Sequence, residues 1–382
     1  MRVLLIVGSA NDIFIYNYAK WLKSSIDINI DVFEFYPSAA QGFNSEYFNN
    51  VTSPKESYSF YGARYISPFF LAKNLKRFIK GKQYDIIHCH RIVPPVVLVN
   101  NLKSYCKKLV ITLWGGELDN LSILGSKKLY RCRLNSFAKK VDAIINGSAA
   151  EELLKINLPS FKGLYYSASF GSSPIESLYN LMLKVSRQES KEFLGLPTEK
   201  YSVLVGYSGK ELHRHIPIIE ELAKRDDLKS KIHLLLPMTR GAGETYVKSV
   251  REAVEKSGYT FTMFSGRFYD DREVAHIRNA TDLVLQLSLY DGFSRSIIEC
   301  FYAKSLVIYG DWLGYEPSLK LDGFKGISVK SISEAVSRVS DILREIDSFS
   351  DILELNHING GKKYFWSECI KDWVRAYRNL LS

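Results

Sequence analysis

The chain has 382 residues, of which 46% are hydrophobic and 24% charged, a composition typical of a soluble globular protein with two domains. No apolar run reaches the roughly 18 residues that cross a bilayer. The five cysteines are scattered without CxxC spacing, so neither a disulfide framework nor a zinc site is expected. The apolar start, 1–8, is too short for a signal peptide, and we expect a first buried strand and a reducing, cytoplasmic setting.

The first half of the sequence alternates short apolar runs with helical patterns. A helix is expected at 11–24, and strands are expected at 3–7, 28–35, 84–89, 109–113 and 143–145. This alternation predicts a doubly wound parallel sheet. Residues 36–68 are rich in Asn, Ser, Tyr, Phe and Gly and lack periodicity, so we expect a long loop there.

A second series of alternating elements begins after 195–197. Strands are expected at 202–205, 232–236, 260–264, 282–287 and 306–309, with helices between them. These elements predict a second Rossmann-like unit, joined to the first through 170–200. The chain ends in a helix with an apolar stripe formed by Trp366, Ile370, Trp373 and Tyr377. We therefore expect an α/β protein with domains at 1–180 and 181–361, the final helix 362–381 packing back on the first.

The most informative stretch is the turn after the apolar run 283–287. It holds two acidic residues eight positions apart, Asp291 and Glu299, with Gly292 and Phe293 between them. A helix is expected to begin just after this turn, and free N–H groups at a helix N-terminus favour an anion. Ionised carboxylates only accept hydrogen bonds, so they suit sugar hydroxyls. The stretch therefore offers donors for a phosphate and acceptors for hydroxyls, which a nucleotide-sugar presents.

The positive charge is concentrated in the first half of the chain. Residues 1–180 carry 22 Lys and Arg against 13 Asp and Glu, and so hold most of the net charge of +10. Two basic stretches, 73–82 and 127–140, have apolar residues interleaved as in amphipathic helices. Such helices indicate contact with an anionic membrane surface, and a solvated helix face with its aliphatic residues in the core is the alternative.

Longer stretches of the chain resemble the GT-B glycosyltransferases, and glycosyltransferase family 4 in particular. The turn 291–294 with Glu299 is similar to the family's acidic motif, and "YDIIHCHRIVPP" and "SKEFLGLPTEKYSVLVGYSG" are similar to its first-domain strand and to the entry of its second domain. "GYSGKELHRHI", "LLLPMTRGAGETY" and "LWGGELD" also look like the family that transfers 4-acetamido-4,6-dideoxygalactose to a lipid-linked acceptor. Asp291 replaces the family's usual Glu, Ser294 replaces a glycine, and Arg295 is unusual beside it, which leaves the donor sugar and the stereochemistry open.

The resemblance implies two Rossmann-like domains facing across a cleft, with the nucleotide-sugar held by the second. It places Glu299 on the ribose, Asp291 on the transferred sugar, and a glycine-rich loop on the diphosphate, where cations neutralise charge on the leaving group. An ordinary glycine-rich turn and a solvated carboxylate on an apolar helix are the alternatives for the loop and for Glu299. The expected donor-site residues are Gly8, Ser208, Gly209, Lys210, Arg214, Arg240, Ser265, Gly266, Arg267, Gly292, Phe293, Ser294 and Glu299.

The acceptor is expected in the first domain, where "WGGELD" follows the strand 109–113 and so stands at the edge of the sheet. Glu117 is the candidate general base, and with Asp291 and Lys210 it completes the expected catalytic set. Trp114, Asp119 and His90 are expected to bind the acceptor, and a helix N-cap is the alternative role for both acidic residues. No Cys or carboxylate stands at ligand spacing from His90, so we expect no metal.

The sequence thus predicts a metal-independent, retaining glycosyltransferase that moves a sugar from a nucleoside diphosphate sugar, with UDP as the expected nucleotide, to a saccharide on a lipid diphosphate. The expected setting is bacterial surface polysaccharide or glycolipid synthesis at the inner face of the plasma membrane, with no cofactor and no nucleic acid partner. Two other interpretations stay open. A GT-B sugar-nucleotide epimerase needs no acceptor, and a basic nucleic-acid-binding protein would line a groove with cations and stacking aromatics.

Overall fold

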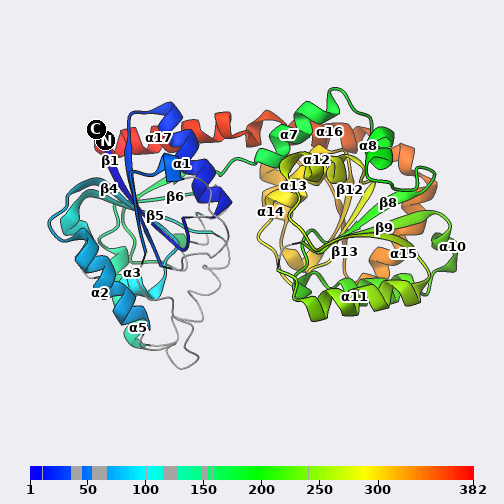
Figure 1. The fold of residues 1–382 in the computed structure, drawn as a ribbon, viewed down its shortest axis with the longest axis horizontal. Coiled ribbons are helices and arrows are strands. Elements are labelled where there is room, and N and C mark those ends of the chain that lie inside the picture. Colours follow the sequence, from blue (N-terminus) through cyan, green and yellow to red (C-terminus); the bar gives the residue numbers. More distant parts are fainter. Residues whose placement is uncertain are drawn as a thin grey trace. The chain divides into compact units, whose positions relative to one another are not determined.

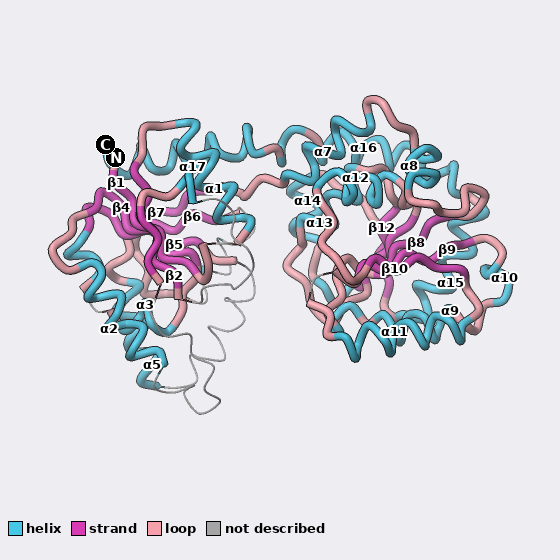
Figure 2. Tube along the Cα trace, in the orientation of Figure 1, coloured by secondary structure: helices cyan, strands magenta, loops and turns pink. Residues whose placement is uncertain are grey.

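The computed structural model of the chain describes residues 1–10, 12–35, 45–53, 67–99, 101–114, 128–147, 151, 154–155, 158–239 and 241–382. The described residues divide into two units (Figure 1), one of Met1–Gly171 with Trp366–Ser382 and the other of Ser172–Phe365. Each unit has a sheet at its centre with helices around it (Figure 2). Both sheets are parallel, as the alternation of strands and helices in the sequence predicts.

The described part of the first unit holds a seven-stranded sheet in the order β3-β2-β1-β4-β5-β6-β7. The strands are β1 (Arg2–Val7), β2 (Asn29–Glu34), β3 (Asn50–Thr52), β4 (Tyr84–His90), β5 (Cys106–Thr112), β6 (Ala143–Asn146) and β7 (Leu164–Ser167). The helices are α1 (Ile13–Ser25), α2 (Ser67–Ile79), α3 (Pro94–Leu98), α5 (Lys128–Ala138) and α17 (Trp366–Leu381). The central strands are continuous apolar runs because helices cover both faces of the sheet.

The final helix, α17, is part of the core of the first unit. Helices α1 and α17 cover one face of the sheet, and α2, α3 and α5 cover the other. All four residues of the apolar stripe expected in the final helix are buried. The indole N–H of Trp373 also donates to the carbonyl oxygen of Ser169 at 2.9 Å. The stripe therefore packs on α1 and the strands beneath it.

Part of the expected loop 36–68 is regular, which corrects the sequence-based prediction. Ser45–Tyr47 forms a 3₁₀ turn, and β3 pairs with β2 at the edge of the sheet. Asn49 supports this edge because its side-chain oxygen accepts the backbone N–H of Ile30 at 2.8 Å. A polar edge strand of three residues lacks the apolar alternation by which strands are recognised. The ranges 36–44 and 54–66 lie outside the described residues.

The second unit is built in the same way, and its sheet has the order β10-β9-β8-β11-β12-β13. The strands are β8 (Tyr201–Val205), β9 (Ile232–Pro237), β10 (Thr260–Phe264), β11 (Leu283–Gln286), β12 (Leu306–Gly310) and β13 (Ile327–Val329). The helices are α7 (Ser173–Met182), α8 (Arg187–Phe193), α9 (His215–Leu222), α10 (Asp226–Lys229), α11 (Glu244–Ser257), α12 (Asp271–Asn279), α13 (Arg295–Tyr302), α14 (Glu316–Asp322), α15 (Ile332–Arg344) and α16 (Ser350–Gly360). Helices α9, α11 and α15 cover one face, and α7, α12, α13 and α14 cover the other.

The boundary between the units falls after Gly171 rather than at the expected residue 180. Helix α7 lies in the second unit because Ile175 and Leu178 are buried in that unit's core. Tyr364 is buried in the same core, so the segment that returns to the first unit begins at Trp366 rather than at 362. The two units thus begin and end a few residues away from the expected boundaries, because these short segments carry apolar residues that either core could bury.

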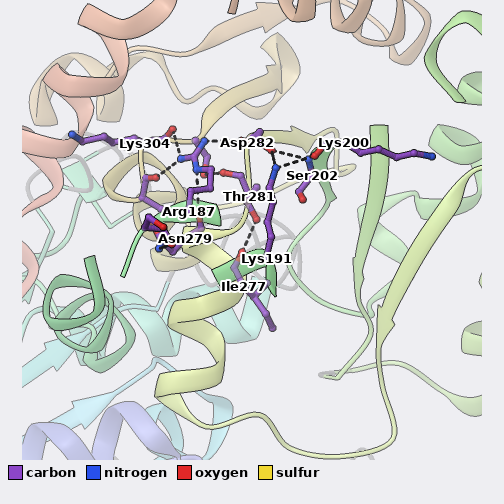
Figure 3. Close-up of polar contacts among 12 residues, drawn as sticks. Arg187, Lys191, Lys200, Ser202, Ile277, Asn279, Thr281, Asp282 and Lys304 are labelled. Atoms are coloured by element: carbon purple, nitrogen blue, oxygen red, sulfur yellow. Dashed lines mark hydrogen bonds and ion pairs between the residues drawn. The ribbon is translucent and has the colours of Figure 1, made fainter. Parts of the chain in front are cut away.

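The segment expected as a connection, 170–200, is anchored in the second unit by a buried ionic network (Figure 3). Arg187 donates to one carboxylate oxygen of Asp282 at 2.9 Å and to three carbonyl oxygens of neighbouring loops. Lys191, whose side chain is 7% exposed, donates to the other oxygen of Asp282 at 2.7 Å. Asp282 also accepts the backbone N–H of Ser202. The network therefore fixes α8 at the amino ends of β8 and β11, and the opposite ends of these strands carry the candidate site.

Candidate functional site

The two turns singled out in the second half of the sequence are neighbours in the structure. The glycine-rich turn follows β8 and the acidic turn follows β11, and these strands pair in parallel. Their loops therefore leave the sheet at the same edge. The backbone N–H of Leu289 donates to the carbonyl oxygen of Leu212 at 2.9 Å, which joins the two loops directly.

A buried histidine holds the glycine-rich turn in place. Gly206 has a φ of +63°, and a Cβ at this position would lie 2.9 Å from the Cβ of His213, so the turn requires glycine. His213 Nε2 lies 2.8 Å from the hydroxyl oxygen of Ser208. Burial, and then the neighbouring Lys210, lower the pKa of His213 to about 4, which keeps its ring neutral. The turn is thus held by a hydrogen bond between two neutral side chains, and the cations that border it stay available to bind an anion.

Two cations border this turn. Lys210 is exposed, and its aliphatic chain passes close to Gly241. Arg214 has a left-handed backbone with a φ of 58° just before α9, and its guanidinium carbon lies 5.8 Å from the ring centroid of Trp312. Neither cation forms an ion pair with a carboxylate in the part of the chain that the structure describes. The two cations and the free N–H groups at the start of α9 suit a phosphate anion.

The carboxylate of Asp291 is held by hydrogen bonds from three separate segments. Its Oδ1 accepts the hydroxyl of Tyr207, from the glycine-rich turn, at 2.6 Å. Its Oδ2 accepts the hydroxyl of Tyr315 and, at 3.2 Å, the backbone N–H of Ser294. Burial, and then the charge of Asp291, raise the pKa of both tyrosines above the ordinary value. Both phenols therefore stay protonated and donate to a carboxylate that cannot turn.

The backbone between Asp291 and α13 is strained. Phe293 has a φ of 58°, which is unusual for an aromatic residue. Its ring packs against Tyr315 with the centroids 5.1 Å apart, and this contact helps to enforce the conformation. Gly292 is exposed, and among the described atoms none lies within 4 Å of a Cβ built on it. Strain of this kind gathers at functional sites, and here it leaves the backbone open to a ligand.

Glu299 lies inside the second unit. It is 4% exposed, its Oε1 accepts the hydroxyl of Ser172 at 2.9 Å, and its Oε2 accepts the Nε–H of Arg278 at 3.1 Å. Burial raises the pKa of Glu299, and Arg278 opposes this shift. The solvated-carboxylate interpretation is therefore wrong. A ribose contact, as the resemblance implies, has to use the lone pairs that these two partners leave on the carboxylate.

The remaining residues of the expected donor site are spread over other segments. Ser265, Gly266 and Arg267 follow β10, which is separated from β8 by β9. Arg267 donates to Glu273 at 2.9 Å and lies 4.0 Å from the ring centroid of Tyr269, so its side chain is already engaged. Arg240 lies outside the described residues. Gly8 follows β1 in the first unit, where a Cβ would meet no described atom within 4 Å.

In the first unit, His90 ends β4 and Trp114 follows the adjacent β5, with their ring centroids 6.1 Å apart. His90 is 2% exposed, and neither of its ring nitrogens has a hydrogen-bond partner among the described residues. Burial, and then Arg91, lower the pKa of His90 to about 3. Arg91 has a φ of 92°, and its guanidinium lies over the indole of Trp114. Glu117 and Asp119 lie outside the described residues, so their roles stay predictions.

His88 shares a strand face with His90 but serves the core. Its Nδ1 lies 2.7 Å from the hydroxyl oxygen of Tyr377, and its Nε2 lies 2.8 Å from that of Thr112. Within the described ranges, no three His, Cys, Asp or Glu side chains come together as metal ligands do. None of the helices that the structure describes has the length and apolar character needed to cross a bilayer.

Comparisons with known proteins agree with this arrangement. Residues 2–148 match the family model described as "Glycosyl transferase 4-like". Over its length the chain is similar to sucrose-phosphate synthase from Thermosynechococcus elongatus, with a TM-score of 0.72 and 15% identity, covering 100% of this chain and 99% of that one. The chain has the GT-B fold, which it shares with solved glycosyltransferases.

Other solved structures are similar to this chain. HepE from Anabaena, in complex with UDP and glucose, matches with a TM-score of 0.69 and 16% identity over 99% of each chain. A glycosyltransferase from Rickettsia africae matches with a TM-score of 0.70 and 12% identity over 100% of this chain and 99% of that one. At these identities the likeness concerns the fold. A sequence search of curated proteins gives no match, and the narrower likeness to the 4-acetamido-4,6-dideoxygalactose transferases stays a prediction.

Sequence reasoning missed the residues that hold the two acidic side chains of the second unit. Tyr207 stands inside the quoted motif "GYSG", and its place between two glycines was the one available signal. Tyr315 and Arg278 are 24 and 21 residues away from Asp291 and Glu299, and no local pattern links them to those partners. The contacts of Asp291 exist because several strands end at one edge of the sheet, and Arg278 meets Glu299 because α12 and α13 cover the same face of that sheet.

Proposed function

We propose that this protein is a glycosyltransferase that moves a sugar from a nucleoside diphosphate sugar, with UDP as the nucleotide, to a saccharide carried on a lipid diphosphate. The second unit binds the donor and the first unit binds the acceptor. The proposal rests on one observation: Lys210 and Arg214 border a glycine-rich turn, and the fixed carboxylate of Asp291 stands beside that turn. HepE, which shares the fold, has been solved with UDP and with UDP-glucose, and this supports UDP as the first nucleotide to test.

The residues of the second unit act by positioning and electrostatics. Lys210 and Arg214 stabilise the negative charge that grows on the departing diphosphate. These cations and the N–H groups of α9 supply the positive potential, so the proposed transfer is metal-independent. Asp291 accepts a hydroxyl of the donor sugar and thereby orients the anomeric carbon. We infer retention of configuration from the resemblance of the acidic turn to that of glycosyltransferase family 4.

Nucleotide binding tests the donor site. A thermal-shift panel of UDP, GDP, TDP and ADP in the presence of EDTA should show stabilisation by UDP. At a concentration of 100 times Kd, a ligand adds about 2.7 kcal/mol to the free energy of unfolding. Lys210→Ala should weaken UDP binding about tenfold or more, and Lys224→Ala, at an exposed position where Lys224 pairs with Glu221, should not. If none of the four diphosphates raises the melting temperature, the donor site is refuted.

Two further variants test the proposed roles of the acidic residues. Glu117→Gln should lower turnover and leave UDP binding intact, because a general base acts only in the chemical step. Glu299→Gln should weaken UDP binding through the lost ribose contact. Unchanged UDP binding in Glu299→Gln would confine this residue to the internal pair with Arg278. Conversion of a UDP-sugar by the wild type without any acceptor would favour an epimerase.

The location that we propose, at the inner face of the plasma membrane, rests on the exposed face of α2. Leu71, Leu75 and Ile79 are buried in the core, so the apolar side of this helix is not available to lipid. The opposite side carries Phe69, which is 62% exposed, and four exposed cations. The cations are Lys73, Lys76, Arg77 and Lys80. No carboxylate in the described ranges pairs with them, and each adds about 1 kcal/mol of attraction to an anionic leaflet.

Vesicle binding tests this location. The protein should sediment with phosphatidylcholine vesicles that contain phosphatidylglycerol, and high salt should release it. Replacing the four cations of α2 with Gln should abolish sedimentation. The matched control replaces four exposed lysines of the second unit with Gln and should leave sedimentation unchanged. These control positions are Lys224, Lys231, Lys248 and Lys256. Equal binding to neutral vesicles would contradict an electrostatic contact.

A further inference from the structure

The hydrogen bonds around Asp291 form a chain with only one consistent direction. Gln286 is fully buried at the end of β11, and its Nε2 donates to the hydroxyl oxygen of Tyr315 at 3.0 Å. Tyr315 is 1% exposed and has one hydroxyl proton. Because the phenol oxygen already accepts from Gln286, that proton is directed to the carboxylate of Asp291. The reverse direction would require an acceptor at Gln286 and a proton on Asp291.

A second phenol reaches the same carboxylate from the opposite side. The hydroxyl of Tyr207 donates to Oδ1 of Asp291, and the ring of Tyr207 packs against His213 at 4.3 Å between centroids. His213 in turn holds Ser208 in the glycine-rich turn. Tyr207 therefore connects two parts of the proposed donor site. One is the glycine-rich turn, which the proposed function assigns to the diphosphate, and the other is the carboxylate of Asp291, which it assigns to the sugar. The hydrogen bond between Tyr207 and Asp291 links these two parts directly, in addition to the backbone bond between Leu289 and Leu212.

We propose that Tyr207 and Tyr315 are positioning residues that hold Asp291 to accept a single hydroxyl of the donor sugar. An ionised carboxylate offers about four lone-pair sites. Within the described part of the chain, three are occupied, by Tyr207, Tyr315 and the backbone N–H of Ser294, which leaves one. This inference rests on the proposed function and adds a rule of specificity: the donor sugar needs a free hydroxyl at one carbon, and a deoxy or O-substituted sugar at that carbon is rejected.

The position of Asp291 accounts for its departure from the usual glutamate of the resembled family. A carboxylate one methylene longer would extend past the two phenols or displace them. Tyr315 cannot yield, since it is buried and its ring packs against Phe293. The shorter side chain of Asp291 thus fits the space between the two tyrosines. The three residues form one hydrogen-bonded cluster that sequence similarity alone does not reveal.

The test compares three phenylalanine variants. Tyr207→Phe and Tyr315→Phe each remove one donor to Asp291 and should lower kcat about 10- to 100-fold, the loss expected for a hydrogen bond to a charged group. UDP affinity should stay within about twofold, because these phenols act on the sugar end. Tyr309→Phe is the matched control. Its hydroxyl donates to Glu316, its ring lies 5.5 Å from Tyr315, and its kcat should equal that of the wild type.

A double-variant cycle separates positioning from a general loss of structure. In an Asp291→Asn background, adding Tyr315→Phe should change kcat by less than about threefold, because the carboxylate that the phenol positions is already gone. UDP-sugars lacking one hydroxyl at a time should identify a single position whose loss strongly lowers kcat/KM in the wild type. With Asp291→Asn, the same analogue should lower kcat/KM only slightly relative to the complete UDP-sugar.

The outcomes distinguish this inference from the function on which it rests. If the wild type binds none of the nucleoside diphosphates, the proposed function fails and the inference fails with it. If the wild type binds UDP while Tyr207→Phe and Tyr315→Phe transfer sugar like Tyr309→Phe, this inference alone is overturned. It is also overturned if UDP affinity falls as far as kcat in both variants, which would mean that the phenols only maintain the loop.

Discussion

We expect His90 to make the first unit less stable in acid, and its replacement should show this directly. The imidazole lies in an aromatic cluster, 4.1 Å from His88 and 5.3 Å from Tyr18 between ring centroids. Neither ring nitrogen has a hydrogen-bond partner among the described residues. Protonation would therefore place an unpaired charge in the core, next to Arg91. The informative change is His90→Leu, which removes the titrating group and keeps an apolar side chain.

The sign and size of the effect follow from the pKa of His90. Burial lowers this pKa from 6.5 to about 3, so below pH 6.5 the unfolded chain binds a proton that the folded chain does not. Stability is therefore complete above pH 6.5 and is lost as the pH falls toward 3. Between pH 7 and pH 5 the loss from His90 alone is about 2 kcal/mol. His88, whose pKa is also lowered by burial, adds to the loss in the same direction.

Urea unfolding at pH 7, 6 and 5 measures the effect in the full chain. A Trp312→Phe background leaves tryptophans only in the first unit, so their fluorescence reports on that unit. The unfolding free energy of His90→Leu relative to the parent should rise by about 2 kcal/mol from pH 7 to pH 5. Phe170→Leu perturbs the same cluster without removing a titrating group. The difference between its unfolding free energy and that of the parent should not change with pH. A His90→Leu difference that is constant across this range would refute the reasoning.

Two further predictions concern the second unit. Asp282→Ala leaves the buried ammonium of Lys191 without its carboxylate and should lower the free energy of unfolding by about 3–5 kcal/mol. The control Asp226→Ala removes an exposed pair and should lower this free energy by less than about 1 kcal/mol. Equal urea midpoints for the two variants would contradict the role of the network. Gly209→Ala should weaken UDP binding at least about tenfold, since its Cβ would clash with a neighbouring side chain and shift the turn, while Gly243→Ala has open space. UDP affinities that match between the two glycine variants, measured by titration calorimetry, would show that the turn does not hold the nucleotide.

Much of the fold could be predicted from local pattern. Strands such as β1 and β9 are runs of apolar residues that only a sheet covered on both faces can bury, and the glycines near 206 and 292 mark the turns after two of the strands. The short edge strand β3 and the start of the second unit at Ser172 escaped prediction. A strand of three half-exposed residues has no alternation, and the apolar face of α7 does not indicate which core buries it.

The candidate site was predicted in part. The residue types at the glycine-rich turn and at Asp291 indicated anion and hydroxyl recognition, and the structure brings these two turns together. Glu299 was expected to contact the ribose, with a solvated carboxylate as the alternative. It forms a buried pair with Arg278, so the alternative is wrong and the ribose contact stays a prediction. The backbone strain at Phe293 could not be anticipated, because a left-handed aromatic residue has no sequence signature.

The order of residues along the chain by itself determined two parallel sheets, their turns and the chemical groups at those turns, since each depends on neighbours a few positions away. Only the tertiary structure decided which groups meet. Tyr207, Tyr315 and Asp291 come from three loops that parallel strands deliver to one edge, and Ser172 reaches Glu299 across 127 residues. Contacts of this kind depend on strand order and loop dihedral angles, which local periodicity does not encode.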